Sequence, residues 1–362
     1  MIPIYRPLIE DADVTAVSEA VRSGWVSSKG KEILEFESAF SRYIGKRYGV
    51  STTSGTTALH LALSALDIGI GDEVLVTDFT FVSPVNAVIY QGAVPVLVDA
   101  ENVTWGIDPL LIEKSISKRT KAIIAVHMYG NPAKIDEIRE IAEKHDLYLI
   151  EDCAESVGAQ YNKRKVGTGG IISCFSFYGN KIITTGEGGM CATDDKEIEE
   201  QMRVLRDHGM LTTRRYWHDF IGYNYRMTNM QAALGLAQLS RIEKVIARKR
   251  ELAKEYSELL SPELELQRDP PDSISVFWLY SVLSKNKTVR DKIMRKLSES
   301  EIESRPFFYP VHTMPPYERY VLPNNKFDVS DSISQRGLNL PSYPQLTEED
   351  ILKISKVVND AI

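Results

Sequence analysis

Between residues 48 and 193 the sequence alternates short apolar runs with segments whose apolar residues recur at helical spacing. The runs are strand-like, because they are short, apolar and rich in β-branched residues. Strands that alternate with helices build a mainly parallel sheet, since each helix returns the chain to the edge where the next strand starts. The pattern predicts an α/β fold with helices on both faces of a central sheet. We expect strands at 48–52, 73–77, 94–99, 122–127, 147–150, 171–177 and 190–193, and helices at 57–66, 84–91, 109–115 and 133–145.

Helical and strand patterns also flank this region. A long helical pattern fills 228–260 and turns charged toward its end. We place a domain boundary near residue 245, which gives a large α/β domain, 1–245, and a smaller α+β domain, 246–362. We expect further helices at 11–23, 33–43, 289–300 and 346–362, and further strands at 274–283 and 302–308.

The sequence FSFYGNKIITTGEGGM, residues 175–190, ends an apolar strand, presents Lys181 and continues into a glycine-rich turn. Lysine is normally left in water, because its ammonium is costly to bury without a partner. Desolvation lowers the pKa of a partly buried lysine and frees its amine for Schiff-base chemistry. The alternative is a solvated lysine beside a flexible turn, and the motif alone leaves both interpretations open.

An acidic pair follows the apolar run 147–150, and Asp152 is its second member. The carboxyl ends of parallel strands are where α/β sheets bind ligands. Asp152 together with Lys181 indicates pyridoxal phosphate, since a lysine binds the aldehyde of this cofactor and an aspartate pairs with its ring nitrogen. Asp152 could instead cap the helix that follows the strand.

Small polar residues lie between the strand at 48–52 and the helix at 57–66, in the order Thr53, Ser54, Gly55, Thr56. The first N–H groups of a helix are free, and its dipole favours negative charge there. The stretch therefore predicts a site for the cofactor phosphate, with an ordinary capped helix as the alternative.

Taken together, these motifs resemble the DegT/DnrJ/EryC1/StrS family of sugar aminotransferases, which are fold-type I, aspartate aminotransferase-like enzymes that use pyridoxal phosphate. The resemblance spans nearly the whole chain and keeps the family's order of motifs. They are SGTTAL (54–59), EDCAESVGA (151–159), FSFYGNK (175–181), GEGG (186–189), YNYRMTN (223–229) and IESRPFFYPVHTMPPY (302–317). The last two, with RYWHD (215–219), look most like the branch that aminates carbon 4 of GDP-4-keto-6-deoxymannose to give GDP-perosamine. The resemblance implies L-glutamate as amino donor and a role in making surface polysaccharide such as the O-antigen.

The resemblance also implies roles around the cofactor ring. Lys181 would be the catalytic residue that binds the cofactor and then moves a proton between it and the substrate carbon. Asp152 would pair with the ring nitrogen, and Phe81 would stack on the ring. Glu155 would lie near the ring, at a position where most members carry glutamine. From the sequence without the resemblance, a core aromatic is the preferred interpretation of Phe81, and a solvated helix residue that of Glu155.

The cofactor phosphate has its own implied set of ligands. The hydroxyl of Ser176 would contact it, together with the backbone N–H groups of Thr56 and Thr57 at the start of the helix. Asn224 matches a family asparagine that reaches the phosphate from the neighbouring subunit. The resemblance thus implies a homodimer with shared active sites. Asn224 alone could be a turn residue beside a helix.

The nucleotide-sugar is expected to meet the polar and aromatic segment RPFFYPVH, which contains Arg305, Tyr309 and His312. A guanidinium suits diphosphate, because its N–H groups fork onto two oxygens. His312 would contact the sugar or be a satisfied loop histidine, and the sequence leaves both open. Trp217 and His218 resemble residues of the perosamine branch and are expected to line the same pocket.

Composition limits the partners. The chain has 43 basic and 50 acidic residues, a formal net charge of −7, and no long basic run, so we expect no nucleic acid partner. No apolar run is long enough to span a membrane, and the start lacks a secretory signal pattern, so we expect a cytoplasmic protein. Cys153, Cys174 and Cys191 are expected to be reduced thiols in the core, and no metal site is expected.

Two other activities remain as alternatives. One is an aminotransferase that acts on a dTDP- or UDP-linked keto sugar with the same lysine chemistry. The other is a non-catalytic protein that only binds pyridoxal phosphate or a nucleotide-sugar, although such a protein has no need for Lys181, Asp152 and Ser176 together. A dehydrogenase is disfavoured, because the glycine pairs at Gly69–Gly71 and Gly167–Gly169 lack the third glycine of a dinucleotide fingerprint.

Overall fold

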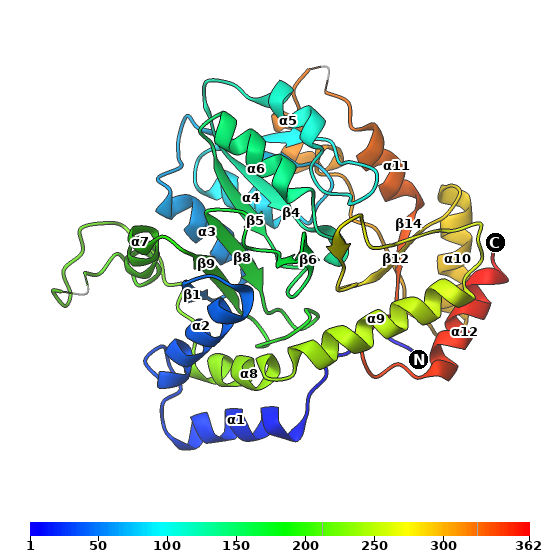
Figure 1. Cartoon of the computed structure of the whole chain (residues 1–362), viewed down its shortest axis with the longest axis horizontal. Coiled ribbons are helices and arrows are strands. Elements are labelled where there is room, and N and C mark those ends of the chain that lie inside the picture. Colours follow the sequence, from blue (N-terminus) through cyan, green and yellow to red (C-terminus); the bar gives the residue numbers. More distant parts are fainter. Residues whose placement is uncertain (212, 324) are drawn as a thin grey trace.

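The computed structural model describes residues 1–211, 213–323 and 325–362 of the chain. At its centre lies a seven-stranded sheet (Figure 1). In spatial order its strands are β1 (Tyr48–Thr52), β9 (Gly189–Thr193), β8 (Ile172–Ser176), β5 (Tyr148–Asp152), β4 (Thr120–Val126), β2 (Glu73–Thr77) and β3 (Val94–Val98). The strands from β8 to β3 are parallel to their neighbours, whereas β9 runs antiparallel to both β1 and β8. The predicted α/β fold with a mainly parallel sheet is confirmed.

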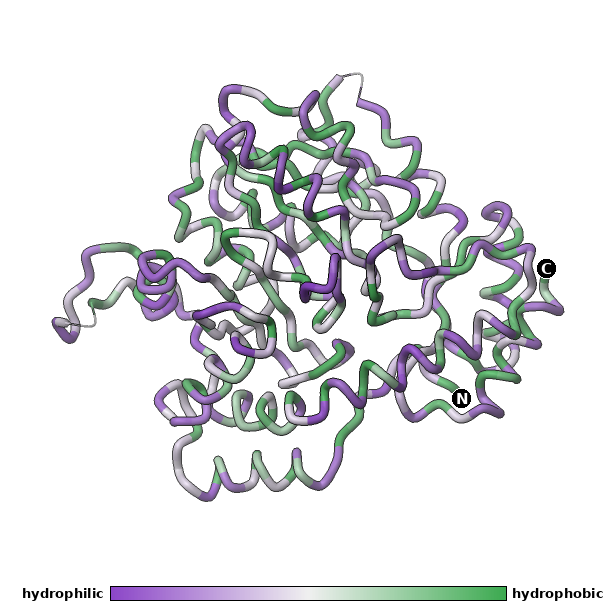
Figure 2. Tube along the Cα trace, in the orientation of Figure 1, coloured by the Kyte–Doolittle hydropathy of each residue, from purple (hydrophilic) through white to green (hydrophobic). Residues whose placement is uncertain are grey.

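Helices cover both faces of this sheet, because successive residues of each strand point to opposite sides. In β2, Val74 and Val76 pack in the core with helices α3 and α4, while Leu75 packs in a second cluster with α5 and α6. The helices of this part are α1 (Asp11–Arg22), α2 (Lys31–Ile44), α3 (Gly55–Ala65), α4 (Ser83–Tyr90), α5 (Pro109–Ser115), α6 (Ile135–Lys144), α7 (Lys196–Arg206) and α8 (Asn229–Leu239). Figure 2 shows hydrophobic and hydrophilic residues alternating along the outer helices, as expected of helices with one buried face.

A smaller antiparallel sheet has the order β10 (Glu265–Leu266), β12 (Tyr280–Leu283), β14 (Gly337–Leu340) and β13 (Arg305–Pro306). It packs with α9 (Ile242–Leu259), α10 (Lys287–Glu299), α11 (Asp328–Arg336) and α12 (Glu348–Asn359). Three two-residue strands, β11 (Ser273–Ile274), β6 (Gln160–Tyr161) and β7 (Arg164–Lys165), form a third sheet that links the two parts of the chain. Two helices and four strands had no counterpart among the elements expected from the sequence: α7, α11, β6, β7, β10 and β14.

The helix expected over 228–260 is wrong in one respect, since α8 and α9 are separate helices. The break falls at Ser240 and Arg241. The Ser240 hydroxyl donates to the carbonyl of Ala237, and the Arg241 guanidinium turns toward Asp13 of α1. Both are tertiary or local side-chain bonds, and no glycine or proline marks the break in the sequence.

The two strands expected in the second half of the chain are also shorter than predicted. In the run 274–283 only the ends are strands, because Phe277 has a left-handed φ of 46° that interrupts the extended backbone. In the run 302–308 the only strand is the two-residue β13, and Ile302 forms just an isolated parallel bridge with Ile2. Irregular residues of both runs, Trp278 and Phe308, line the pocket described below.

Helix α9 joins the two parts of the molecule. Its first turns pack Val245 and Ile246 under the large sheet, and its later turns pack Leu252 and Tyr256 under the small one. The helix is continuous across residue 245, so the division into a large and a small domain stays a proposal.

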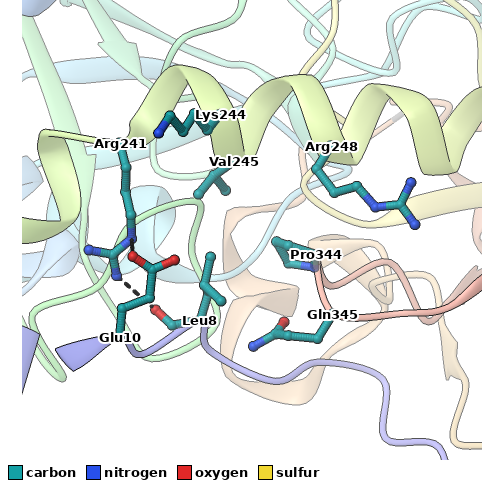
Figure 3. Close-up of a pocket in the computed structure, with 8 residues that line it drawn as sticks. All are labelled: Leu8, Glu10, Arg241, Lys244, Val245, Arg248, Pro344 and Gln345. Carbon is teal, nitrogen blue, oxygen red and sulfur yellow. Dashed lines mark hydrogen bonds and ion pairs between the residues drawn. The ribbon is translucent and has the colours of Figure 1, made fainter. Parts of the chain in front are cut away.

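The N-terminal segment closes the junction beside α9, around a hollow of about 250 Å³ (Figure 3). Arg241 donates to the carbonyl of Leu8 at 3.1 Å and lies 3.5 Å from the Glu10 carboxylate. Gln345, just before α12, donates to the carbonyl of Pro7 at 3.1 Å. These bonds tie both parts of the chain to the N-terminal segment.

The segment after α7, of which the structure describes residues 207–211 and 213–224, projects from the body of the molecule in Figure 1 and is called the projecting segment below. It carries several exposed large apolar side chains, which are Tyr216, Trp217, Phe220 and Ile221. Within the described ranges, no helix combines the length and the apolar character that crossing a membrane requires.

Candidate active site

A pocket of about 410 Å³ opens at the carboxyl ends of β4, β5 and β8, where an α/β sheet is expected to bind its ligand. The strand ends place Val126, Asp152 and Ser176 on its wall. The pocket also receives residues from the start of α3, from the loop after β2 and from the segments at 278 and 305–308. Seven of the residues predicted from the sequence line it: Thr56, Phe81, Asp152, Glu155, Ser176, Lys181 and Arg305.

Lys181 lies in the turn after β8 and is held through its backbone. Its N–H donates to the carbonyl of Tyr178 at 2.9 Å, and its carbonyl accepts the Tyr5 hydroxyl at 2.6 Å. The side-chain nitrogen is 3.7 Å from the ring centroid of Trp278. Burial lowers the pKa of Lys181, and the charges of Glu155 and Asp152 oppose this shift. The lysine is therefore partly buried and its pKa is lowered, as Schiff-base chemistry would need.

Asp152 is the last residue of β5 and is 5 % exposed. One carboxylate oxygen accepts the N–H of Ala154 at 3.0 Å. Burial raises the pKa of Asp152, against the lowering effects of that N–H and of the Lys181 charge. A buried carboxylate with an oxygen left toward the pocket can accept a hydrogen bond from a proton-bearing ring nitrogen of a ligand.

Glu155 follows on the same wall, and Tyr129 holds it in place. The backbone N–H of Tyr129, a residue with a left-handed φ of 50°, donates to one carboxylate oxygen at 2.8 Å. Burial raises the pKa of Glu155 to about 7, against the charge of Lys181, and the charge of Asp152 adds to the increase. Near neutral pH, Glu155 is thus able to take up or give a proton beside Lys181.

The start of α3 forms the polar end of the pocket. Ser54 caps this helix by accepting the N–H of Thr57 at 3.2 Å, so that N–H group is already used. The hydroxyls of Thr56 and Ser83 share a hydrogen bond of 2.8 Å at the wall. Gly55 allows the strand end to approach, because a Cβ there would lie 2.8 Å from the Cβ of Ser176. The N-terminus of α3, together with the hydroxyls of Thr56, Ser83 and Ser176 in the pocket wall, suits the binding of an anion.

Two phenylalanines form the outer wall of the pocket. Phe81, in the loop after β2, is 53 % exposed, so its ring is free to stack on a flat ligand. Its ring centroid is 5.7 Å from that of Phe308, which comes from the segment after β13. Segments from the first and second halves of the chain therefore meet at this wall.

The residues predicted to bind the acceptor are separated by the structure. Arg305 lines the pocket, is about half exposed and pairs with Glu303 at 3.5 Å. Tyr309 is 66 % exposed and does not belong to the pocket lining. His312 also lies outside the lining, because its ring is bound to Asp78 and stacked on Phe327. The bond to Asp78 and the stack on Phe327 favour the satisfied loop histidine, and the sugar contact stays an untested prediction.

Three other predicted residues lie in or beside the projecting segment and not in this chain's pocket. The indole of Trp217 donates to Asp219 at 2.8 Å, and His218 bonds the carbonyl of His208 at 2.9 Å. Asn224 is exposed, and its side-chain oxygen accepts two bonds from Arg226.

The sequence reasoning missed two aromatic residues that shape the pocket. Trp278 lies under Lys181 and donates its indole N–H to the carbonyl of Asn180 at 2.7 Å. Tyr129 holds Glu155 with its backbone, and its hydroxyl accepts the N–H of Phe308 at 3.0 Å. A weak signal existed for Tyr129, since the sequence Met128-Tyr129-Gly130-Asn131-Pro132 follows a strand and contains turn residues. No local pattern marks Trp278.

A second cluster of polar residues lies on the opposite face of β5. His127, Glu151 and Cys153 are close enough together to hold a metal ion in principle, and all three are buried. His127 accepts the N–H of Ala133 on Nδ1 and donates from Nε2 to Glu151 at 3.0 Å. The ligand atoms of His127 and Glu151 are thus used in hydrogen bonds, so we interpret the cluster as structural.

The pocket fits pyridoxal phosphate in each of its parts. It offers an amine with a lowered pKa, a carboxylate at its depth, a free aromatic face and an anion site at a helix N-terminus. These groups, on a fold-type I framework, define an aminotransferase-like enzyme of the pyridoxal-phosphate class.

Comparison with known proteins gives the family. Residues 7–359 match the DegT/DnrJ/EryC1/StrS aminotransferase family, and the chain belongs to it. The chain is therefore an aminotransferase that depends on pyridoxal phosphate. It is 43% identical over 360 residues to a GDP-perosamine synthase from Escherichia coli O157:H7, covering 99% of this chain and 98% of that protein. It is 42% identical over 363 residues to a GDP-perosamine synthase from Vibrio cholerae, covering 99% of each.

Solved structures agree with this assignment. The X-ray structure of an aminotransferase from Psychrobacter cryohalolentis is 31% identical, with a TM-score of 0.92, and the match covers 98% of both chains. The predicted family and enzyme class are confirmed.

Proposed function

We propose that this enzyme transfers the amino group of L-glutamate to the C4 keto group of GDP-4-keto-6-deoxymannose, which gives GDP-perosamine. The observation that carries the proposal is the placement of Lys181, Asp152 and Glu155 around one pocket, in a chain with full-length relatives named GDP-perosamine synthases. The product would be used to build a surface polysaccharide such as an O-antigen.

The residues of the pocket would have different roles in the transfer of the amino group. Bound here, pyridoxal phosphate supplies an aldehyde for an amine and a ring that accepts electrons from the substrate carbon. Lys181 would hold the cofactor and, when its amine is free, carry the proton to and from that carbon. Asp152 would keep a proton on the ring nitrogen, and Glu155 would exchange a proton close to the lysine.

Other residues would position the cofactor. Thr56 and Ser176, at the start of α3 and the end of β8, would hold its phosphate. Thr57 would support that end as part of the helix cap, since its N–H already bonds Ser54. Phe81 would fix the tilt of the ring by stacking on it, and Arg305 would meet the diphosphate at the rim.

We further propose that the working unit is a homodimer with shared sites. Trp217, His218 and Asn224 lie outside this chain's own pocket lining, and the projecting segment exposes a cluster of apolar side chains. A second copy would bury those side chains and receive Asn224 at its phosphate site and Trp217 near its sugar site. Asn224→Ala should weaken cofactor retention about tenfold, the loss of roughly one charge-assisted hydrogen bond. Unchanged cofactor affinity in equilibrium dialysis would count against shared sites.

A cytoplasmic location is part of the proposal. The three cysteines are buried and unpaired, as suits a reducing compartment.

The test is the visible absorption spectrum of the purified protein, recorded before and after addition of L-glutamate. We expect a yellow band that bleaches with glutamate and returns on addition of GDP-4-keto-6-deoxymannose. Return of the band with a dTDP- or UDP-linked keto sugar alone would move the acceptor to the other nucleotide class. A protein that stays colourless with added pyridoxal phosphate would leave only a non-catalytic binding role.

A further inference from the structure

The carboxyl end of β2 carries a carboxylate that the mechanism does not use. Asp78 follows directly after β2 and is fully buried. Its two oxygens bond one residue, His312: Oδ1 accepts the backbone N–H at 2.8 Å and Oδ2 lies 2.8 Å from ring Nδ1. The backbone carbonyl of Asp78 accepts the N–H of Val311 at 2.9 Å. Three bonds therefore join this strand end to two consecutive residues of the second half of the chain.

The ring of His312 is fixed on its other sides as well. It stacks on Phe327, with ring centroids 4.4 Å apart and planes inclined by 13°. Its Nε2 lies 3.6 Å from the Asp331 carboxylate of α11. The ring is thus held between β2 and α11 and lies outside the pocket lining that contains Lys181.

The residues just before His312 are those that reach the pocket. Arg305 and Phe308 line it, and Phe308 meets Phe81, which lies three residues after Asp78. Phe308 has a second anchor, since its N–H donates to the Tyr129 hydroxyl and its ring stacks on Tyr129 at 5.2 Å. Asp78 and His312 therefore fix both ends of the contact between Phe81 and Phe308.

A neighbouring strand repeats the arrangement. Asp99 follows β3 directly and accepts the N–H groups of Val329 and Ser330 at 3.0 and 2.9 Å, together with the Ser330 hydroxyl at 2.6 Å. Adjacent strand ends thus each bind residues between 311 and 330. This recurrence indicates that these residues are docked on the large sheet by carboxylates and do not rest on apolar contact alone.

We propose that Asp78 and His312 form a clamp that positions segment 305–312 as the acceptor side of the pocket, which makes His312 a positioning residue and not a sugar contact. The proposal rests on the proposed function for the identity of the acceptor. L-glutamate is small enough to react deep in the pocket, whereas a nucleotide-sugar must extend to the rim where Arg305 and Phe308 lie. The clamp therefore acts on the binding of the nucleotide-sugar more than on that of glutamate.

The test compares His312→Phe with His312→Asn. Phenylalanine keeps the stack on Phe327 but has no N–H for Asp78, while asparagine places an N–H where Nδ1 was. In the holoenzyme, we expect His312→Phe to raise the KM for GDP-4-keto-6-deoxymannose about 10- to 100-fold, the equivalent of one hydrogen bond to a charged group. The KM for glutamate should change less than about threefold, and His312→Asn should stay within about threefold for both substrates.

Hydrogen exchange supplies a readout that needs no acceptor. We expect the amides of 305–313 to exchange faster in His312→Phe and at the native rate in His312→Asn. If His312→Phe does not fold, His312→Gln serves as the clamp-breaking variant, because its amide nitrogen lies too far along the side chain to replace Nδ1.

Two outcomes would overturn the clamp. One is native exchange of 305–313 in both clamp-breaking variants. The other is a rise in the KM for GDP-4-keto-6-deoxymannose in His312→Asn equal to that in His312→Phe, which would make the ring itself a substrate contact. If the native enzyme aminates no GDP-linked sugar, the proposed function fails while the exchange experiment still decides the clamp.

Discussion

The end of β5 presents two neighbouring carboxylates to opposite faces of the central sheet, and their surroundings differ completely. Glu151 points to the face covered by α5 and α6, where four hydrogen bonds reach its oxygens, from His127 and from the N–H groups of Gly167, Gly169 and Gly170. Asp152 points to the pocket and accepts one protein N–H, from Ala154. Both oxygens of Glu151 are therefore bonded within the fold, whereas Asp152 has an oxygen available for a ligand.

The pKa values of Glu151 and Asp152 reflect this difference in hydrogen bonding. Burial alone raises the pKa of Glu151, but the bonds from His127, Gly167 and Gly170 bring it below the ordinary value. Burial also raises the pKa of Asp152, and there the few opposing interactions do not cancel it. Adjacent buried residues thus differ because hydrogen-bond donors, not burial, decide which one is stabilised as an anion.

Among the variants that distinguish the two faces of the central sheet, Lys181→Ala is expected to have the largest effect on turnover. It removes the amine on the Asp152 side and leaves the Glu151 network intact. We expect turnover to fall by more than about 10⁴-fold, because the proposed mechanism assigns both covalent binding of the cofactor and proton transfer to Lys181. Turnover is measured with glutamate and the keto sugar, and folding by thermal melting of the apoenzyme.

A matched control for this variant is Lys249→Met. Lys249 is another buried lysine, in α9, and burial lowers its pKa to about 7. Its amine bonds the Ser342 carbonyl at 2.5 Å in the second half of the chain, outside the pocket lining. We expect turnover within about twofold of the native enzyme. Equal loss in both variants would mean that any buried lysine supports the activity.

Glu151→Gln tests the other face. The amide puts two donors where four N–H groups converge, so at least one donor is left unpaired in the core. We expect the unfolding free energy of the apoenzyme to fall by about 3–5 kcal/mol at pH 7, as when one partner of a buried charged network is removed. Because the pKa of Glu151 is lowered in the fold, its contribution is present above the unfolded pKa and disappears as pH falls through the folded value. Urea unfolding at pH 7 and in acid measures both effects, and an unchanged stability at pH 7 would refute the structural role of Glu151.

Asp152→Asn should show the reverse pattern. We expect turnover to fall by roughly 10²-fold or more, because the charge that the proposed mechanism places beside the cofactor ring is gone. Since the pKa of Asp152 is raised in the fold, its ionised form is unfavourable there, and the apoenzyme at pH 8 should be no less stable than the native protein. The same urea series checks this. A loss of stability as large as that of Glu151→Gln would erase the distinction between the two faces.

The smallest effect is expected for Glu155→Gln, measured as stability against pH. Burial raises the pKa of Glu155 to about 7 in the fold, above its unfolded value, so its stabilising contribution is complete in acid and is lost as pH rises through about 7. The apoenzyme of Glu155→Gln should therefore gain stability relative to the native protein between pH 5 and 8, by up to about 3 kcal/mol. Parallel curves for the two proteins would show that Glu155 is ionised throughout.

Much of the fold followed from the sequence, because its elements are fixed by local periodicity. Every strand expected between 48 and 193 formed, and the helices there moved by no more than two or three residues at an end. The failures share a cause. The break between α8 and α9 depends on Arg241 reaching Asp13, and the short strands after residue 273 depend on segments that fit against the pocket, so no local pattern reports them.

The residues of the site also fall into those that the sequence located and those that only the tertiary structure placed. Lys181, Asp152 and the start of α3 could be located by sequence alone, since chemistry needs those residue types at strand ends and at a helix N-terminus. Only the tertiary structure decided that Glu151 is consumed by glycine N–H groups, that Tyr129 holds Glu155, and that His312 is bound by Asp78. Each of these depends on donors brought together from distant parts of the chain, and the number of donors around a buried group is a property of packing that no single stretch of sequence contains.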